Sequence, residues 1–535
     1  MKKRKIILSV SIVTVFVLLI YITDMVRNWE NFENNTEGEE TKETVSLEWY
    51  INYSWFDTTW GESMVSREIT KITGVDIDFV IPKGNEADKI SSMIEMDTLP
   101  DLVTVGWWGT EGREMIAGNQ VFAINELAEE YDSAFFQVAD EDTVKWYTSK
   151  DGNLYGYPNY SYTYKDFLEN TKVPSNQNFL VRKDIYEAIG SPDMTTPEGF
   201  SQAVKKAAQM FPEVDGEPLI PIGADEFTDR GNNSFDGYLQ NFLAVPYEED
   251  GKYYDRYTDE EYVRWLKVFR QLGEEGYLSD DIFIDKRSQL EEKIRKGRYF
   301  CLLYQSSDIE DQEKVIYSEN PERIYIAVDG PKNSRGDDPA LPVAGMNGWT
   351  VTYISKNCKN PEKALELMTY MLSEEGQKMV YYGVEGAMYE VKDGKIETKP
   401  EVKELMNTDR EKYNQIYGGA DAYWMLKDSV ADATWKDNNF SCISEMEEWT
   451  YPYTVYTGQY DMNFEDDTRS MAIYNRLLRI WSDTLPRLLM AESEEAFDLI
   501  LQEYIREREA NGYEEFCQVA TEIFQKNKER IGIEE

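Results

Sequence analysis

Hydrophobic residues in the first part of the chain follow two spacings. Residues 45–54 form an apolar run that ends in aromatic and polar residues, 75–82 alternate between apolar and polar, and 102–105 are again apolar. These three segments are predicted strands, while 63–75 and 86–96 repeat apolar residues at helical spacing. The resulting strand-helix-strand-helix-strand order favours a parallel sheet with helices on its faces.

A second series of the same kind begins at residue 178. Thr196 and Pro197 predict the start of a helix, the first as its cap and the second as its first residue. A later helix, over 259–277, gathers its large apolar residues on one face. Further strands are predicted at 218–223, 298–304, 323–331 and 348–355, a helix at 360–383, and mostly helix over the last hundred residues.

Length and composition indicate how many domains to expect and which class of protein this is. A chain of 535 residues is too long for one core, so several domains or one large two-lobed body are expected. It carries 56 basic and 101 acidic residues, a formal net charge of −45. This charge argues against binding nucleic acid, whose phosphates would be repelled, and against lying on an anionic membrane surface.

Several kinds of catalytic site are excluded by missing residues. The sequence has no histidine, which excludes Ser-His-Asp triads, Cys-His pairs and the HExxH zinc site. The glycine spacing of a phosphate-binding loop is also missing. The four cysteines show no CxxC spacing and predict no disulfide. We therefore expect no catalytic residue and no cofactor.

The N-terminus has the pattern of an export signal. Residues 1–5 are basic and predicted to stay in the cytoplasm, 6–26 are predicted as a signal or anchor helix, and 27–44 as an acidic, flexible tether. No small-x-small cleavage site follows the uncharged run of 17 residues from Ile6 to Ile22, which lies at the lower edge of a membrane span. An uncleaved anchor is favoured, with the body outside; a cleaved signal peptide stays open as the alternative.

Ordered short motifs add a resemblance to a known family. The stretch "NPEKALELMTYMLSEEGQKMVYYGVEG" at 360–386 is the most specific, and "FLVRKDIYEAIGSPDMTTPEGF", "DTLPDLV", "DGNLYGYP" and "AESEEAFD" fit as well. Together they resemble the large, membrane-tethered, carbohydrate-type extracellular solute-binding proteins of ABC importers, related to maltose-binding protein. Most such receptors are lipoproteins with a cysteine just after the signal, whereas the first cysteine here is Cys301. This departure favours the helix anchor over a lipid.

The resemblance implies a fold and its boundaries. It implies a two-lobed type II α/β fold, each lobe a mostly parallel sheet flanked by helices, with a helical C-terminal part. The crossings between lobes would fall near Phe179 and Pro339, and the chain would leave the first lobe again near Asn360. Some relatives carry a calcium loop, but "FPEVDGEPL" at 211–219 has too few oxygen ligands, so no metal is predicted. The implied ranges are 45–178 for the first part of lobe 1, 179–338 for the first part of lobe 2, 339–362 for the return to lobe 1, and 363–535 for a helical part mainly in lobe 2.

Trp107 and Trp108 are the leading candidates for contact with a solute. They follow the strand 102–105 and stand between Gly106 and Gly109. In open α/β sheets, ligands bind beyond the carboxyl ends of strands, and flat aromatic rings suit the apolar face of a sugar. The alternative is that one or both indoles belong to the core.

The same strand-end argument selects further candidates. They are Trp55, Asp57, Asn159, Tyr160, Asp225, Glu226, Tyr304, Gln305, Asn347, Trp349, Tyr423 and Trp424, with Asp421 beside the last pair. Each has a packing or solvated-surface alternative. Arg182 and Asp184 are interpreted as a structural ion pair.

These observations favour a binding protein over an enzyme. The resemblance implies an extracellular receptor, a monomer on the outer face of the cytoplasmic membrane. It would capture an oligosaccharide or sugar derivative and deliver it to the membrane subunits of an ABC permease. The alternatives are a surface sensor or adhesion subunit with the same fold, and a polysaccharide-degrading enzyme. The abundance of acidic residues makes any carboxylate pair uninformative about glycoside hydrolysis.

Overall fold

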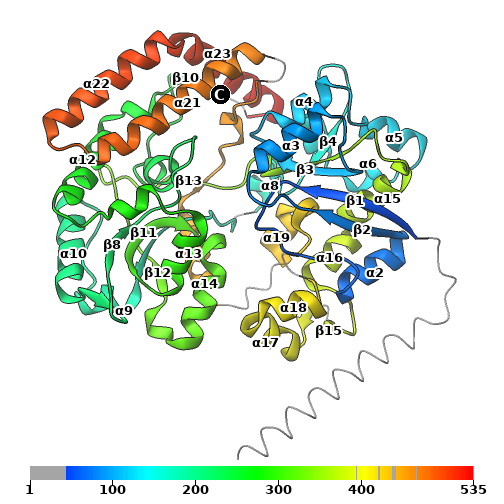
Figure 1. Ribbon diagram of the computed structural model, residues 1–535, viewed down its shortest axis with the longest axis horizontal. Helices are drawn as coiled ribbons and strands as arrows, with labels where there is room; N and C mark the ends of the chain where they lie inside the picture. The colour runs from blue at the N-terminus through cyan, green and yellow to red at the C-terminus, as the bar shows by residue number, and fades with distance from the viewer. Residues whose placement is uncertain are drawn as a thin grey trace, which may run out of the picture.

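The computed structural model describes residues 44–170, 172–392, 395–419, 422–435, 441–464 and 467–533. The predicted anchor helix at 6–26, nearly all of the tether and the candidate Asp421 lie outside these ranges. Within the ranges, none of the helices combines the length and apolar character that a membrane crossing needs. The described chain forms two lobes, each built around one sheet (Figure 1).

Lobe 1 contains a five-stranded sheet in the order β2-β1-β3-β14-β4. β1 pairs in parallel with β2 and β3, whereas β14 pairs antiparallel with β3 and β4. In the register of the central pair, Thr350 at the start of β14 lies opposite Gly106 at the end of β3. The strands are β1 (Val45–Ile51), β2 (Val75–Val80), β3 (Leu102–Gly106), β4 (Gly156–Pro158) and β14 (Thr350–Ile354).

Lobe 2 contains a four-stranded sheet in the order β12-β5-β11-β8. β11 is parallel to β8, but β5 is antiparallel to both β11 and β12. The prediction of a two-lobed α/β fold with mostly parallel sheets is confirmed, because all strands except β14 in lobe 1 and β5 in lobe 2 run in the same direction. β5 and β14 are reversed because they enter from the other lobe, so each begins where its neighbour, β11 or β3, ends. The strands are β5 (Gln177–Arg182), β8 (Ile220–Gly223), β11 (Tyr299–Gln305) and β12 (Tyr325–Ala327).

Helices cover both sheets (Figure 1). Thr196 caps α10 through its side chain, which accepts a hydrogen bond from Gly199 N at 3.1 Å, as predicted. On lobe 1 lie α2 (Met64–Thr73), α3 (Glu86–Glu95), α4 (Glu111–Ala117), α5 (Ile124–Glu130), α6 (Phe135–Val138), α7 (Glu141–Tyr147), α15 (Pro361–Leu372), α16 (Glu374–Tyr382), α17 (Pro400–Thr408) and α18 (Arg410–Ile416). On lobe 2 lie α9 (Lys183–Ala188), α10 (Pro197–Met210), α11 (Leu239–Phe242), α12 (Glu260–Glu274), α13 (Arg287–Arg295), α14 (Ser306–Glu319), α20 (Ser441–Thr450), α21 (Thr468–Leu489), α22 (Glu494–Ala510) and α23 (Tyr513–Ile531).

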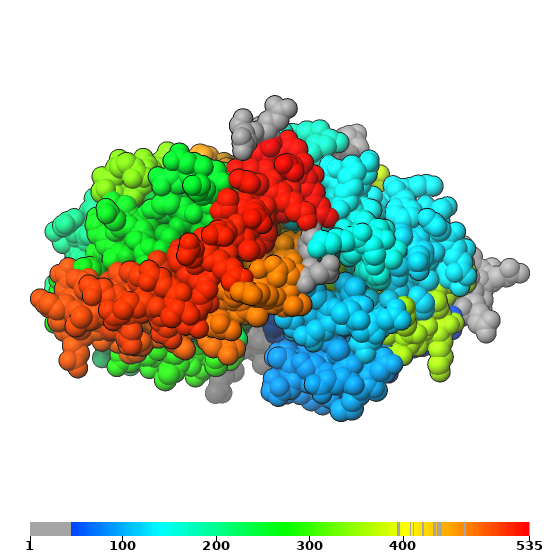
Figure 2. Space-filling view, turned by 90° about the horizontal axis from the view of Figure 1, so that it is seen from above, coloured from blue at the N-terminus to red at the C-terminus, as the bar shows by residue number. Residues whose placement is uncertain are grey.

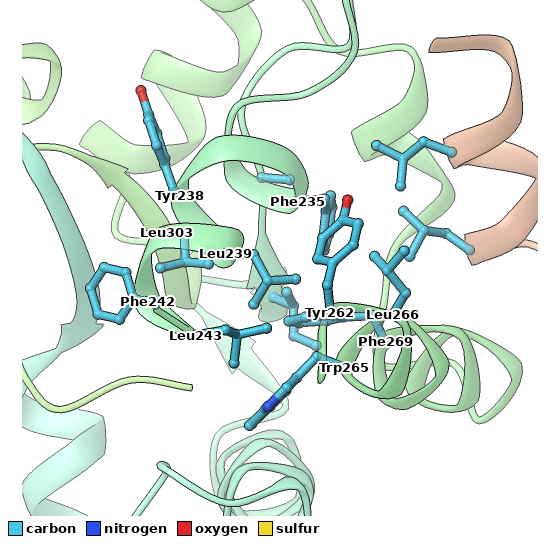
Figure 3. Close-up of a cluster of buried hydrophobic side chains, with 14 of the residues drawn as sticks. Phe235, Tyr238, Leu239, Phe242, Leu243, Tyr262, Trp265, Leu266, Phe269 and Leu303 are labelled. Atoms are coloured by element: carbon cyan, nitrogen blue, oxygen red, sulfur yellow. The ribbon is translucent and has the colours of Figure 1, made fainter. Parts of the chain in front are cut away.

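Large aromatic side chains dominate the core of lobe 2. Figure 3 shows residues of the 235–243 segment facing Tyr262, Trp265 and Phe269 of α12. Burying one such side chain contributes about 1.5–3 kcal/mol relative to leaving it exposed. Tyr238 differs from the rest, because its hydroxyl points out of this cluster and accepts a hydrogen bond from the amide of Gln305. The core thus holds in place a polar group at the end of β11.

The C-terminal part is divided between the lobes. Buried residues from Ala364 to Leu426 belong to the core of lobe 1, whereas α20 and α21–α23 pack into lobe 2. The prediction that the chain leaves lobe 1 near Asn360, and the assignment of 363–535 mainly to lobe 2, are therefore wrong for 363–426. The apolar face of a helix shows that it is buried but not which of two sheets buries it.

The chain crosses between the lobes after β4, β12 and Leu426, and the described parts of these three connections include α8 (Tyr164–Glu169) and α19 (Ser429–Trp435). β13 (Leu341–Pro342), on the connection after β12, pairs with β17 (Thr454–Val455), which follows α20 of lobe 2. The C-terminal helix also bridges the lobes, since Arg530 donates to Lys145 O at 2.8 Å and Trp146 O at 2.6 Å. Figure 2 shows this C-terminal part in red against the cyan of lobe 1.

Candidate ligand-binding site

Three tryptophans form a stacked group at the carboxyl end of β1, which we name the tryptophan wall (Trp55, Trp349, Trp424). The ring centroids of Trp349 and Trp424 lie 4.4 Å apart, and those of Trp55 and Trp349 lie 6.2 Å apart with 24° between the planes. Trp424 is buried, Trp349 is half-buried, and Trp55 is 52% exposed. The group therefore presents a supported aromatic surface on the edge of lobe 1 that carries the crossings to lobe 2.

Asn159 holds two members of the wall in place. Its Oδ1 accepts from Thr350 N at 2.9 Å and Trp349 N at 3.3 Å, and its Nδ2 donates to Trp424 O at 3.3 Å. The side chain is fully buried and these bonds give it a positional role, and its contact with a solute stays a prediction. Gly348 is needed beside it, because a Cβ there would lie 1.6 Å from Asn159 O and φ is +59°.

Trp107 and Trp108 lie in different environments. Trp107 packs against the buried residues of lobe 1, whereas Trp108 is 42% exposed. Their rings meet edge to face at 6.4 Å. A Cβ on Gly106 would lie 2.8 Å from the Trp108 indole, so glycine allows this ring to lie back over the strand end. One indole is thus anchored in the core and the other is presented at the surface.

Lobe 2 meets lobe 1 at Trp108 through Arg230. The guanidinium Nη2 of Arg230 donates to Trp108 O at 3.3 Å. Behind this contact lies Arg113, which donates to Gly109 O at 2.9 Å. Burial, and to a smaller extent the charge on Arg230, lowers the pKa of Arg113 from its usual value. Two arginines thus flank the exposed tryptophan despite the acidic composition.

The loop that carries Arg230 is fixed by a buried carboxylate. Asp236 accepts from Asn232 N at 2.8 Å, from the Tyr262 hydroxyl at 3.0 Å and from Trp481 Nε1 at 2.7 Å. Burial raises the pKa of Asp236 to about 6. Sequence reasoning missed Arg230, although its place after a strand and before Gly231, whose φ is +113°, was a usable signal.

The polar candidates of lobe 2 have partners of their own. Glu226 accepts from Lys286 Nζ at 2.7 Å and from Arg287 N at 3.0 Å. Asp225 accepts from Asn233 Nδ2 at 2.7 Å, and burial raises its pKa. Asp225 follows β8, next to the end of β11, and so faces the inter-lobe edge together with Gln305.

Tyr304 lies below that edge, in the body of lobe 2. Its side chain is 1% exposed, and its hydroxyl makes no hydrogen bond to any described residue. A solute would have to displace neighbouring side chains to reach it, and contact between Tyr304 and a solute stays a prediction. β11 points Tyr304 inward because successive side chains of a strand alternate between its two faces.

Two further candidates are structural. Asn347 is buried at the hinge, where it accepts from Trp146 Nε1 at 2.8 Å and donates to Asp461 at 2.7 Å. Tyr423 is fully buried and its hydroxyl donates to Thr59 O at 2.9 Å. Both side chains are held inside the protein, because the end of a strand fixes where a residue lies but not which way it points; their contact with a solute stays a prediction.

The remaining predictions are easily placed. Asp57 is exposed just beyond the wall, and Tyr160 is half-buried, with its amide donating to Lys427 O at 2.7 Å.

The Arg182–Asp184 ion pair is confirmed at 2.8 Å. All four cysteines are free. Within the described ranges no three acidic or cysteine side chains converge as metal ligands would. A charged cavity of about 260 Å³ lies between α13 and α14, apart from these candidates.

Comparison with known proteins identifies the family. Residues 66–404 match the sequence pattern of the bacterial extracellular solute-binding proteins. The chain belongs to this family. Lipoprotein LipO of Bacillus subtilis is 21% identical over 341 residues, which are 61% of this chain and 64% of LipO. The polygalacturonan/rhamnogalacturonan-binding protein YtcQ of the same organism is 20% identical over 353 residues, which are 63% of this chain and 65% of YtcQ. The chain thus spans slightly less than two thirds of both relatives.

The fold of this solute-binding protein is also shared with a solved structure. The alginate-binding protein AlgQ2 without calcium superposes with a TM-score of 0.67 at 18% identity, over 92% of this chain and all of AlgQ2. At this identity the likeness concerns the fold, which is the two-lobed arrangement described above.

Proposed function

We propose that this protein captures an oligosaccharide or sugar derivative between its lobes and delivers it to an ABC permease. The observation that carries the proposal is the tryptophan wall at the inter-lobe edge. Indole rings cover the apolar C–H face of a sugar, and a few fixed polar groups then orient its hydroxyls. Trp55 and Trp108, both well exposed, offer two separate surfaces to successive sugar units.

Relatives support a saccharide as the solute. YtcQ is named for binding polygalacturonan and rhamnogalacturonan, and AlgQ2 for binding alginate. Both names describe polymers that carry carboxylates. The pair Arg113 and Arg230 beside Trp108 would suit such a solute in this chain, although its overall charge is −45.

Lobe closure would complete the site. The contact between Arg230 and Trp108 joins the two sides directly, and the three connections provide a hinge. Closure of two domains around a ligand by hinge motion is a general mode of solute capture. A solute bound against both lobes would favour the closed arrangement by its extra contacts there.

A screen of oligosaccharides by thermal unfolding tests this proposal. A solute at 100 times its dissociation constant adds about 2.7 kcal/mol of stability, which raises the unfolding midpoint. We expect at least one pectin- or alginate-derived oligosaccharide to raise the midpoint of the wild-type protein, and to raise the midpoint of the Trp55→Ala variant clearly less at the same concentration. If no saccharide shifts the midpoint, the function is wrong. If product accumulates on long incubation, the alternative of a polysaccharide-degrading enzyme is favoured.

We further propose that residues 6–26 anchor the protein to the outside of the membrane. The proposal rests on the uncharged run Ile6–Ile22 and on the absence of any cysteine before Cys301. The protein should fractionate with membranes and take up no labelled fatty acid. A mature protein released into the medium and starting after Asp24 would contradict this anchoring. A surface sensor with the same fold remains the alternative if binding proceeds without any permease-dependent uptake.

A further inference from the structure

Lobe 2 contains a cavity of about 190 Å³ that is separate from the inter-lobe edge. It lies between α11, the segment around β10 (Lys252–Tyr253) and the C-terminal helices α21–α23, in the upper left region of Figure 1. None of the residues predicted to contact the solute lines it. The cavity is therefore distinct from the proposed solute site.

Aromatic rings make up most of the cavity wall. Seven of its fourteen lining residues are tyrosines: Tyr247, Tyr253, Tyr257, Tyr460, Tyr474, Tyr504 and Tyr513. The rings of Tyr247 and Tyr460 are parallel, 4.8 Å apart with 5° between the planes. The Arg256 guanidinium lies 3.9 Å from the centroid of Tyr247. Such flat walls suit a ligand that is itself a ring, and the stack holds the guanidinium in place.

Two hydrogen-bond donors on this wall have no partner among the described residues. Gln240 is 3% exposed, and its Nε2 makes no hydrogen bond. The Nε of Arg256 is likewise buried without a hydrogen bond, although its Nη2 donates to Asn241 Oδ1 at 2.5 Å. A buried donor left unsatisfied costs about 1–3 kcal/mol. Because both groups are donors, a ligand that satisfies them must supply acceptors.

The charges around the cavity further limit the kinds of ligand that it can bind. No described carboxylate pairs with the Arg256 guanidinium, and the neighbouring Asp255 is paired instead with Arg508 at 2.6 Å. An arginine that lines a cavity without an acidic partner is unusual in a chain with 101 acidic residues. Arginine and an amide N–H together match the two oxygens of a carboxylate.

We propose that this cavity is a second binding site, for a small ring that carries a carboxylate. Arg256 and Gln240 bind the carboxylate, and the tyrosine rings cover the faces of the ligand ring. The volume of about 190 Å³ falls below the roughly 300–1,000 Å³ typical of sites for larger ligands, which limits the ligand to a single ring. Monosaccharide uronic acids and aromatic acids share this chemistry.

Calorimetric titration of the full chain in detergent tests the site, with galacturonate, benzoate and neutral galactose as probes. We expect one of the two carboxylates to bind, and galactose to bind at least about tenfold more weakly. Arg256→Met should weaken binding by about 10- to 100-fold, the loss of a charge-assisted hydrogen bond. Gln240→Met, of similar size, should also weaken it, and Trp55→Ala should leave it unchanged. Circular dichroism of each variant confirms folding.

The outcomes separate this site from the solute site. Preference for galacturonate over benzoate identifies a sugar acid, and the reverse identifies an aromatic acid. The proposal is overturned if neither carboxylate binds in the millimolar range, or if galactose binds equally well. It is also overturned if Trp55→Ala abolishes binding while both Arg256→Met and Gln240→Met retain it, because the probe would then occupy the inter-lobe site. Failure of the oligosaccharide screen leaves these results unaffected.

Discussion

Replacing Glu313 by glutamine should make the protein more stable at neutral pH. Glu313 lies on α14 and is fully buried in lobe 2. Its Oε1 accepts from Tyr325 N at 2.6 Å, and its Oε2 makes no hydrogen bond to any described residue. Burial raises the pKa of this carboxyl from 4.5 to about 8, against the smaller, opposite effect of the bond from Tyr325. The folded protein therefore keeps a proton that the unfolded chain releases.

The sign and size of the effect follow from this difference in pKa. Because the folded state binds the extra proton, the contribution of Glu313 is most favourable below pH 4.5 and is lost as the pH rises towards 8. The loss is about 1.4 kcal/mol per pH unit, hence about 3 kcal/mol by pH 7. Glutamine keeps the acceptor for Tyr325 and carries no titrating proton, so Glu313→Gln should avoid the loss. Asp236 and Asp461, whose pKa values burial raises to about 6 and about 7, act in the same direction in both proteins and cancel in the difference.

Urea unfolding followed by circular dichroism between pH 5 and 8 measures this difference. The free energy of unfolding of Glu313→Gln relative to wild type should grow steadily with pH. Glu319→Gln makes the same exchange at an exposed position of the same helix and should show no such growth. A wild-type-to-variant difference that stays constant from pH 5 to 8 would refute the argument that Glu313 is buried in its protonated form.

Three further substitutions probe the tryptophans. Trp424→Ala removes a buried ring and should lower the free energy of unfolding by about 3–5 kcal/mol, measured by urea unfolding without ligand; a loss below 1 kcal/mol would be inconsistent with its burial. Trp108→Ala should weaken oligosaccharide binding by about 1–3 kcal/mol in calorimetry with little change in stability, and the reverse pattern would place this indole in the core. Gly348→Ala should destabilise lobe 1 and weaken binding together, because its Cβ would overlap Asn159 O and displace Trp349; normal melting and binding would contradict that geometry.

The sequence predicts the fold better than it predicts the packing partners. Strand and helix segments follow from the apolar spacing, and the order of short motifs identifies the two-lobed class. The direction of β5 and β14 was not predictable from local pattern, because it depends on which lobe the chain comes from. The same limitation explains why α15, clearly amphipathic, was assigned to the wrong lobe.

For the candidate site too, the sequence predicts where residues lie better than it predicts which way their side chains point. Strand ends predicted that Trp55, Trp108 and Trp349 lie near one edge of the lobe 1 sheet, because the carboxyl ends of neighbouring strands share one edge; that this edge binds a solute stays a prediction. They could not show that Asn159 is buried beneath these residues, since orientation is set by distant hydrogen-bond partners. Arg230 was overlooked because an arginine in a polar loop is usually solvated, and the position before Gly231 does not by itself show the contact with Trp108.

The claim that solute binds against the tryptophan wall is tested most directly by titrating an oligosaccharide into wild type and Trp55→Ala in parallel calorimetry. Phe136→Ala is the matched control, because Phe136 is 43% exposed on lobe 1, close to the 52% of Trp55, but lies outside the wall. We expect Phe136→Ala to bind as wild type does, and Trp55→Ala to bind about tenfold more weakly or worse. Equal affinity of Trp55→Ala and wild type would contradict the proposed site.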